Sequence, residues 1–536
     1  MLIFAIFGVL LLGTLLILVT HSRKPSSARS WVIAITAASL ALVASFVLRL
    51  YLPSEINLTT WHIGSSFEVT LGLSIGYRNW PYIVAVLSMS VAVLLTDTTQ
   101  ADETTSHSSW MRVLSVTALN MVAILASNPI TMAISWMAID LVEVASLLRL
   151  SRASKLGSKI TSAFGIRILS TFLLIIAASN SWASDAGQVG YIQATNSSIY
   201  SLIAAGLRLG VFPINLPFLD SPELKRGAGI LFRLMPAASA LVLIANLPEE
   251  FILFNTNLAG AVQVLTLVAA LYSAVMWVTR PDTYEAQPYW VVALSSFAIQ
   301  SALNGYPEAS RVWGLALLLS GSLLFLFNPP IRRIRFLPML GLLGFIGLPY
   351  TLAASGWEGL LPDQFNFTWL VMILTHALLV TGYVRFIMKS DSSVTGLEKF
   401  ARITFPLRLV VLIQTLLLLN WVGWPGVITV GNLWGSLGSL AIVVAEVLIS
   451  WRLNWQMPEA SLIEKLPFYR LVILLINFLR KIMSFAWLWA LLERFFRWLG
   501  NIGDFIHQIL EGDGGVLWSL VFMVIVAIIF LSVGSP

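Results

Sequence analysis

The chain alternates long apolar runs with short polar segments from one end to the other. An apolar run of about 20 residues is long enough to cross the hydrocarbon core of a bilayer as an α-helix. Alternating segments of about ten residues, which are typical of membrane β-barrels, do not recur along the chain. The pattern therefore predicts an all-α polytopic membrane protein with about 16 transmembrane helices. The predicted spans lie near residues 2–20, 30–51, 80–97, 110–127, 129–149, 160–182, 197–218, 229–247, 259–279, 287–304, 311–328, 336–355, 367–388, 404–423, 430–451 and 515–534.

Two segments do not have the pattern of a span. Residues 61–77 alternate polar and apolar positions, which predicts a short hairpin on the outer face. Residues 456–512 are amphipathic, with polar residues recurring at helical intervals in an otherwise apolar sequence. An unbroken helix over 463–510 would be about 70 Å long and would lie on the membrane surface or along other helices. The alternative is a pair of shorter interfacial helices, and Pro467 limits where a single helix begins.

The charges of the loops give the spans a direction. Lys and Arg gather in the connections that follow odd-numbered spans, and the other connections are nearly free of them, with Arg78 as the main exception. Positively charged loops stay in the cytoplasm. We therefore expect a multi-pass protein of the inner (cytoplasmic) membrane of a prokaryote, with both termini on the outer side. The first run lacks a basic start and a cleavage site, so we interpret it as a retained helix.

Composition agrees with this class and excludes several kinds of chemistry. Hydrophobic residues make up 58% of the chain and charged residues 11%, well below the roughly 25% of soluble proteins. The absence of cysteine excludes thiolate metal sites and bound iron–sulfur clusters, and no Walker or dinucleotide-binding motif is present. We therefore predict no cofactor, no metal site and no enzymatic active site in this chain. The net charge of +6 does not indicate nucleic acid, because topology explains the basic loops.

Ionisable side chains inside membrane spans are costly and are usually functional. Asp140 and Glu143 are three residues apart, so they share one face of the fifth span. Acids near basic residues and broken helices are typical of proton relays, and the alternative is a set of static buried ion pairs. The candidate proton-pathway residues are Asp140, Glu143, Arg208, Arg233, Glu358 and His376.

The basic members of this set differ in what they can do. A guanidinium keeps its proton, so Arg208 and Arg233 can bias a neighbouring acid but are poor proton carriers. His376 can carry a proton, although a lone His in a helix is more often simply hydrogen-bonded. Two segments interrupted by Gly and Pro, GVFPINLP and GFIGLPYTLAASG, lie five spans apart, as expected for broken helices 7 and 12 of two inverted repeats.

Several segments together resemble one known family in their order and spacing. They are WMAIDLVEVASLL, GIRILSTFLL, GLRLGVFPINLPFLD followed by RGAGILFRLMPAASALVLI, and IGLPYTLAASGWEGLL. These segments resemble the antiporter-like, proton-conducting subunits of respiratory complex I, a family shared with Mrp-type antiporters and membrane-bound hydrogenases. A C-terminal lateral helix is similar to that of the largest of these subunits.

The resemblance implies roles for three of the charged residues. Asp140 stands at the position of the family's span-5 glutamate, Arg208 at that of its span-7 lysine, and Arg233 at that of its span-8 histidine or lysine. In the family, the acid and the lysine gate a proton half-channel, and the central basic residues connect it to the exit side.

Other family positions are occupied differently in this chain. The family's span-12 lysine falls on Trp357, next to Glu358, and a further lysine falls near Gly321. Arg167 matches an arginine of the family, whereas Ser170 stands where the family has an aspartate. The resemblance therefore implies that the first half keeps the signs of its charges and that the second half lacks the lysines.

The resemblance also implies a domain organisation. Residues 1–109 would hold helices 1–3 with the hairpin, 110–255 the first antiporter-like half (helices 4–8), 256–390 the second half (helices 9–13), 391–455 helices 14 and 15, 456–512 the amphipathic lateral helix, and 513–536 the final anchor.

The predicted function is that of a membrane subunit in a complex I-like respiratory assembly of the NADH-quinone oxidoreductase type. It would translocate protons through its buried charges, coupled to electron transfer on other subunits. One alternative is a degenerate, non-pumping structural subunit, and another is a cation/proton antiporter or inorganic-carbon uptake membrane subunit. The expected partners are other membrane subunits, including antiporter-like sisters, and the lipid bilayer, but not nucleic acid.

Overall fold

The chain divides into two compact units, Met1–Arg480 and Lys481–Pro536, and the elements named below all belong to the first. The predicted lateral helix, 456–512, and the predicted final anchor, 513–536, lie outside the described residues except for short helical pieces. The computed structural model describes residues 2–23, 27–63, 67–97, 107–150, 154–184, 195–212, 216, 226–247, 256–327, 334–361, 366–388, 399–452, 493–494, 497–498, 500–501 and 520–525.

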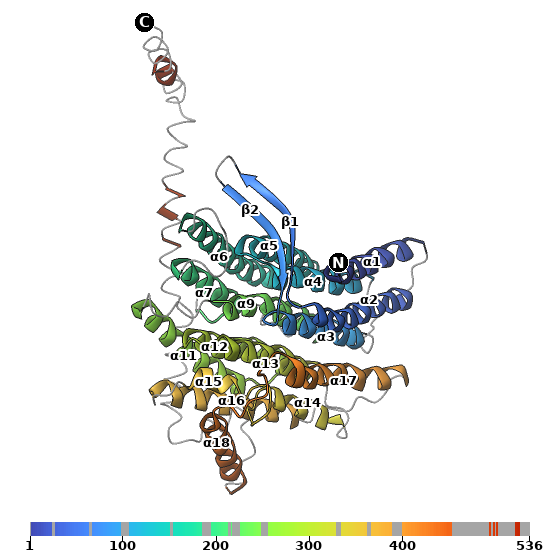
Figure 1. The fold of residues 1–536 in the computed structure, drawn as a ribbon, viewed down its shortest axis with the longest axis vertical. Helices are drawn as coiled ribbons and strands as arrows, with labels where there is room; N and C mark the ends of the chain where they lie inside the picture. The colour runs from blue at the N-terminus through green and yellow to red at the C-terminus, as the bar shows by residue number, and fades with distance from the viewer. Residues whose placement is uncertain are drawn as a thin grey trace. The chain divides into compact units, whose positions relative to one another are not determined.

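The first unit is a bundle of helices with one β-hairpin (Figure 1). Among the described residues, eight helices are long and apolar enough to cross a membrane, and five shorter apolar helices accompany them. The helices up to residue 245 are α1 (Leu2–Arg23), α2 (Ser27–Leu48), α3 (Trp80–Asp97), α4 (His107–Leu125), α5 (Pro129–Leu150), α6 (Ser154–Ser184), α7 (Thr195–Leu209), α8 (Arg226–Gly229), the π-helix η3 (Ile230–Leu234) and α9 (Met235–Ala245), with the 3-10 helix η1 (Arg49–Tyr51) after α2.

The later part of the bundle also consists of long helices with one broken segment. Its elements are α11 (Thr256–Thr279), α12 (Thr283–Leu303), α13 (Pro307–Leu326), α14 (Phe336–Leu340), the 3-10 helix η5 (Gly341–Gly344), α15 (Gly356–Leu360), α16 (Phe367–Met388), α17 (Lys399–Val422) and α18 (Leu433–Arg452).

The seventh and twelfth predicted spans, 197–218 and 336–355, were both expected to be broken at their Gly/Pro segments. In the seventh, α7 ends at Leu209, because Gly210 takes a positive φ of 74° that a helix cannot contain. In the twelfth, the chain forms α14, η5 and then α15, and Gly347 with its φ of 76° lies in the non-helical stretch between η5 and α15.

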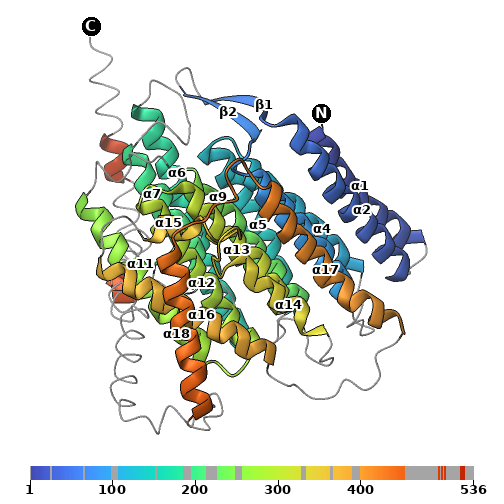
Figure 2. The ribbon, with the colours of Figure 1, turned by 60° about the horizontal axis from the view of Figure 1, so that its bottom comes forward.

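The predicted hairpin at 61–77 is part of a longer one. Strands β1 (Ser54–Ile63) and β2 (Phe67–Ile75) pair in an antiparallel register that sets Ser54 opposite Ile75. The hairpin projects beyond the ends of the helices, and β2 contacts α4 and α5 (Figure 2).

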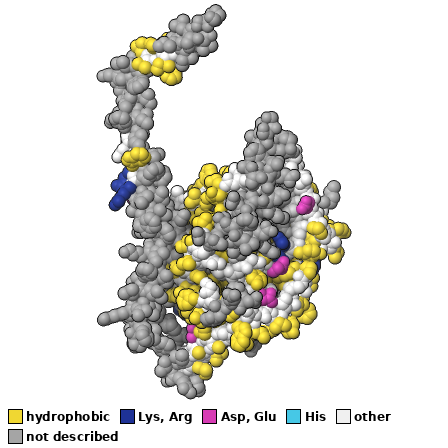
Figure 3. Space-filling view, turned by 60° about the vertical axis from the view of Figure 1, so that its left-hand side comes forward, with side chains coloured by type: hydrophobic (Ala, Val, Ile, Leu, Met, Phe, Trp, Pro, Cys, Tyr) yellow, Lys and Arg dark blue, Asp and Glu magenta, His cyan; other side chains and the backbone are white. Residues whose placement is uncertain are grey.

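Burial separates central helices from peripheral ones. Every side chain from Ala309 to Leu326 of α13 is buried, and α3, α9 and α12 are almost as enclosed, whereas α1 and α2 expose apolar residues along their length. The face drawn in Figure 3 shows mainly hydrophobic and uncharged side chains over the described residues. An apolar exterior is what a lipid environment requires. The chain is therefore a multi-pass helical membrane protein whose centre is formed by α3, α9, α12 and α13.

Candidate functional site

The two predicted acids of the fifth span lie on α5, and both are buried, with 2% of Asp140 and 4% of Glu143 exposed. Asn128 caps the start of α5, because its side-chain oxygen accepts a hydrogen bond of 2.8 Å from the Thr131 backbone N–H. Pro129 then occupies the first helical position, where its missing N–H costs nothing. The cap starts the helix three turns before the acids, and their spacing of three places both on one side of α5.

Asp140 forms a bidentate ion pair with Arg208 of α7. Nη1 of Arg208 donates to Oδ2 at 3.0 Å and Nη2 donates to Oδ1 at 2.8 Å. Arg208 lies in the last turn of α7, where the negative end of the helix dipole favours a cation, and Gly210 ends the helix just after it. The guanidinium also lies over the ring of Trp136, 4.4 Å from the ring centroid. Arg208 is thus held in one orientation by a carboxylate and an aromatic face.

Glu143 forms its ion pair with Arg167 of α6, through Nη1 and Oε2. The same Nη1 lies 3.5 Å from Oδ1 of Asp140, and Nη2 donates to the backbone oxygen of Phe232 at 3.4 Å. Arg167 was not among the predicted pathway residues. The signal that identifies it is the same as for the others, a charged residue inside an apolar run.

Asp140, Glu143, Arg167 and Arg208 together form the ion-pair cluster. It holds two carboxylates and two guanidinium groups, so its formal charge is zero. Because its members come from α5, α6 and α7 and one of them bonds the backbone of η3, the cluster joins four elements. All four side chains are buried, so water does not replace the contacts if one member is removed.

Arg233 belongs to a separate contact. It lies in the π-helix η3, and its Nη1 donates to Oε1 of Gln287 at 2.5 Å and to the backbone oxygen of Tyr284 at 3.3 Å. Both partners are on α12. π-turns are rare and often occur at functional sites. Two neighbouring residues of this turn contact different parts of the protein. The carbonyl of Phe232 accepts a hydrogen bond from Arg167 of the ion-pair cluster, whereas the side chain of Arg233 donates one to Gln287 of α12.

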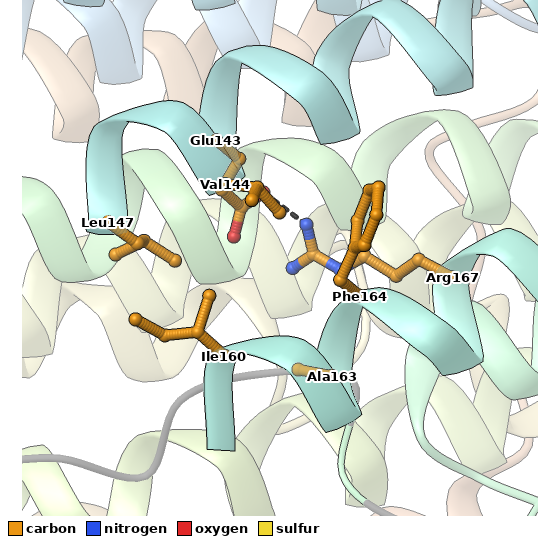
Figure 4. Close-up of a pocket in the computed structure, with 7 residues that line it drawn as sticks. All are labelled: Glu143, Val144, Leu147, Ile160, Ala163, Phe164 and Arg167. Carbon is orange, nitrogen blue, oxygen red and sulfur yellow. Dashed lines mark hydrogen bonds and ion pairs between the residues drawn. The ribbon is translucent and has the colours of Figure 1, made fainter. Parts of the chain in front are cut away.

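A small pocket opens beside the ion-pair cluster, between α5 and α6 (Figure 4). Glu143 and Arg167 point toward each other across it, and the rest of its wall is apolar. The other lining residues are Val144, Leu147, Ile160, Ala163 and Phe164.

The structure does not bring Glu358 or His376 to the ion-pair cluster. Glu358 lies on α15 with an exposed side chain. His376 is buried on α16, where Nδ1 lies 2.7 Å from Oγ of Ser439 and Nε2 lies 2.8 Å from the backbone oxygen of Phe345. Within the described part of the chain, no three His, Asp or Glu side chains gather closely enough to hold a metal ion.

Aromatic side chains surround His376 and fill the centre of the later part of the bundle. Ring centroids lie 4.8 Å apart for His376 and Trp357, 5.7 Å for Trp357 and Trp313, and 5.2 Å for Trp277 and Trp290. Phe345 connects the Trp277–Trp290 pair with the group around His376, because its ring contacts both Trp290 and His376. This aromatic cluster consists of Trp277, Trp290, Trp313, Trp357, Phe297, Phe325, Phe345, Tyr383, Phe386 and His376.

The polar atoms of the four tryptophans are satisfied locally. Every indole N–H donates to a backbone carbonyl, as a buried donor requires. The acceptors of Trp277, Trp290, Trp313 and Trp357 are the carbonyls of Leu379, Leu317, Gly356 and Ile346, at 3.2, 3.1, 2.9 and 3.5 Å.

The two positions at which the family resemblance expects lysines in the later half belong to this region. Trp357 itself is a member of the aromatic cluster and is fully buried. Gly321 lies directly under Trp290, because a Cβ added there would lie 2.5 Å from the indole Nε1. Ser170, at the position of the expected aspartate, donates its hydroxyl to the backbone oxygen of Ala204 at 2.9 Å.

Gly321→Ala is expected to destabilise the protein by about 1–3 kcal/mol, because a methyl group would displace Trp290 from its place. Gly260→Ala on α11 is the matched control, since nothing lies within 4 Å of its Cβ position. The control should be neutral or slightly stabilising, because Ala is the better helix residue. Thermal unfolding of the two purified variants in detergent measures the difference, and equal midpoints would refute this account of Gly321.

No family model and no curated protein matches the sequence. Solved structures with a similar fold include chains of two membrane complexes. One is a chain of the Mrp complex from Dietzia sp. DQ12-45-1b, with 13% sequence identity and a TM-score of 0.68 over 100% of this chain and 63% of that chain. The other is a chain of the membrane-bound sulfane sulfur reductase (MBS), an archaeal respiratory membrane complex, with 13% identity and a TM-score of 0.67 over 98% of this chain and 99% of that chain.

These similarities concern the fold. At 13% identity they carry no residue's role from one protein to another. This chain spans 63% of the length of the Mrp chain that it matches, and nearly the whole of the MBS chain. Its fold is therefore one that occurs in multisubunit membrane complexes.

Proposed function

We propose that this chain is an antiporter-like membrane subunit of a multisubunit complex of the Mrp or respiratory type, and that it acts there as a non-conducting structural subunit. The first part of the proposal is supported by its fold, which occurs in chains of two such complexes. The second part rests on the interior of the later half.

The aromatic cluster is the observation that carries the structural role. A path for protons needs groups that exchange a proton, or space for water between them. Trp357 occupies one position where the resemblance expects a lysine, and Trp290 covers the other at Gly321. Indole and phenyl rings do not exchange protons, and the indole N–H groups already bond backbone carbonyls. The two cluster members that can exchange a proton are hydrogen-bonded locally, His376 to Ser439 and the carbonyl of Phe345, and Tyr383 to the carbonyls of Ser320 and Pro338. Aromatic side chains therefore occupy or cover the two positions at which the resemblance expects lysines of a proton relay.

The ion-pair cluster fits the same role in the earlier half. Its basic members are both arginines, which keep their protons. Both oxygens of Asp140 are occupied by Arg208, and Glu143 is paired with Arg167. A neutral cluster of paired charges such as this one fixes the positions of α5, α6 and α7 relative to one another.

Proton translocation, coupled to electron transfer on other subunits, is the second candidate. The pocket beside Glu143 favours it, because this pocket brings open space to a buried carboxylate. In that case Asp140 would be the gating acid, Arg208 would set its proton affinity, and Arg233 would continue the path toward α12. Cation/proton antiport or inorganic-carbon uptake would use the same residues.

A double substitution separates the two candidates. The variant Asp140→Leu with Arg208→Leu removes one complete ion pair and leaves Glu143 paired with Arg167. The complex that contains the chain would be purified, reconstituted in vesicles and given a pH gradient, with proton flux followed by an enclosed pH dye. We expect the same flux as for wild type. Loss of flux in this variant would overturn the structural role and support translocation.

The matched control is Ile168→Ala with Leu169→Ala, a pair on the exposed side of α6, 38% and 42% exposed. This control should leave flux unchanged under both candidates. Recovery of wild-type chain from native membranes without any other subunit would contradict the first part of the proposal.

A further inference from the structure

Glu446 is an acid inside the last described membrane helix. It lies on α18, whose residues Leu433–Leu448 form one of the shorter apolar helices, and it is six residues from the end of α18 at Arg452. At 1.5 Å per residue this is about 9 Å from the helix end. Its side chain is half-buried. No function proposed above uses it.

One hydrogen bond holds the Glu446 carboxylate. The hydroxyl of Thr381 on α16 donates to Oε2 at 2.5 Å. Among the side chains that the structure describes, which do not include that of Arg452, no Lys, Arg or His lies within salt-bridge distance of Glu446. A hydroxyl satisfies one acceptor site of a carboxylate that has about four.

The charged and titratable groups that the structure describes on the neighbouring helices do not pair with Glu446. Arg385 follows Thr381 by one turn on α16, but it bonds the backbone oxygen of Val278 on α11 and lies over Phe386. His376 bonds Ser439, nearly two turns before Glu446 on α18. Glu358 on α15 is itself an acid. None of these groups neutralises Glu446.

Among the described elements, α18 lies at an edge of the bundle, on the opposite side from α1 and α2 (Figure 2). It packs against α16 and α15. Small residues line its inner face, because Gly435 contacts Trp357, and Ser436 and Ser439 are buried. Its other faces expose large apolar side chains, among them Trp434, Leu437, Val444 and Leu448.

We propose that Glu446 is a docking residue for a partner subunit, and that it receives a Lys or Arg side chain from a membrane helix of that subunit packed along α16 and α18. The inference rests on the proposed function, because it requires a multisubunit complex. Its basis is charge complementarity. An acid inside a membrane helix is generally paired or turned to the protein interior, and this one has a hydroxyl but no cation within the described chain. A cation from a neighbour supplies the missing partner.

Charge reversal at Glu446 tests the inference. The tagged full chain would be purified from native membranes in mild detergent, and the ratio of each co-purifying subunit to this chain would be measured. Glu446→Lys should lower the recovery of one subunit at least tenfold, because it sets two cations against each other. Val444→Lys is the matched control. It places a lysine two residues away on α18, at an exposed position about 200° around the helix. The recovery of the same subunit should then equal that of wild type.

The partner residue is then identified and reversed. A photoreactive amino acid at position 446 maps the contacted peptide of the co-purifying subunit, and its Lys or Arg is replaced by Glu. Restored recovery in the doubly reversed complex is the expected result. Full recovery with Glu446→Lys alone, or a crosslink only to lipid or to residues 453–480 of this chain, would overturn the inference. A wild-type chain that purifies alone would instead refute the proposed function.

Discussion

Asp140→Leu alone is expected to lower the free energy of unfolding by about 3–5 kcal/mol, one of the two largest effects predicted for this chain. The substitution leaves the guanidinium of Arg208, which is 1% exposed, without the carboxylate that accepts both of its hydrogen bonds. A buried charge without a partner loses its hydration and gains nothing in return. Thermal or denaturant unfolding of the purified protein in detergent measures the loss.

The double variant with Arg208→Leu should recover most of this loss, to within about 1 kcal/mol of wild type. A buried ion pair and a well-packed apolar pair are often similar in stability, whereas half a pair is not. Glu285→Ala is the control, because Glu285 pairs with Arg280 at 3.3 Å where both side chains are about one third exposed. It should cost less than about 1 kcal/mol. If the double variant is no more stable than Asp140→Leu, the two residues are not coupled and the pairing account fails.

Trp290→Ala is expected to have an effect of similar size, about 3–5 kcal/mol. Trp290 is fully buried and stacks at an angle on Trp277, with further edge contacts to Phe325 and Phe345. Removal of the indole leaves a cavity in the aromatic cluster and removes the hydrogen bond that the indole N–H donates to the carbonyl of Leu317. The shift of the unfolding midpoint in detergent reports the cost.

Trp434→Ala is the control for this second prediction. Trp434 is on α18 with 76% of its surface exposed, so truncation removes few contacts within the chain, and its effect should stay within about 0.5 kcal/mol. Equal losses for the two tryptophans would mean that the aromatic cluster does not stabilise the later half.

A further variant, Trp357→Lys, places the family's lysine in the cluster and should prevent folding, because no acid lies among the cluster's members.

Sequence reasoning located most of the charged site, and the family resemblance implied that Asp140 and Arg208 act together, but it did not identify the pair of Glu143 and Arg167. Asp140, Glu143 and Arg208 stand out because each is a charge in an apolar run, and all three belong to the ion-pair cluster. The same signal selected Glu358, which turns its side chain to the surface instead. It is also present at Arg167, whose position between Glu143 and Asp140 depends on how α6 lies against α5.

The broken helices show the same division. Pro213 and Pro217, in the segment GVFPINLP, predicted a break in the seventh span, and α7 does end early, but at Leu209, before either proline. A proline forbids a helix over the residues around it, whereas the residue at which a helix ends depends on the cap that forms there. The aromatic cluster had no sequence signal. Its members come from α11, α12, α13, α15 and α16 and from the stretch after η5, and no spacing relates them.

The sequence by itself determined the class of this protein, most of its helices and the presence of a hairpin, which it predicted at residues 61–77 and which the structure extends over 54–75. These features depend on hydrophobicity and period within a window of about 20 residues, which a bilayer selects strongly. Only the tertiary structure decided which charges meet and which interior is aromatic. Such contacts depend on the rotation and depth of helices that are far apart in the chain, such as α5 and α7, and side-chain packing between helices sets both.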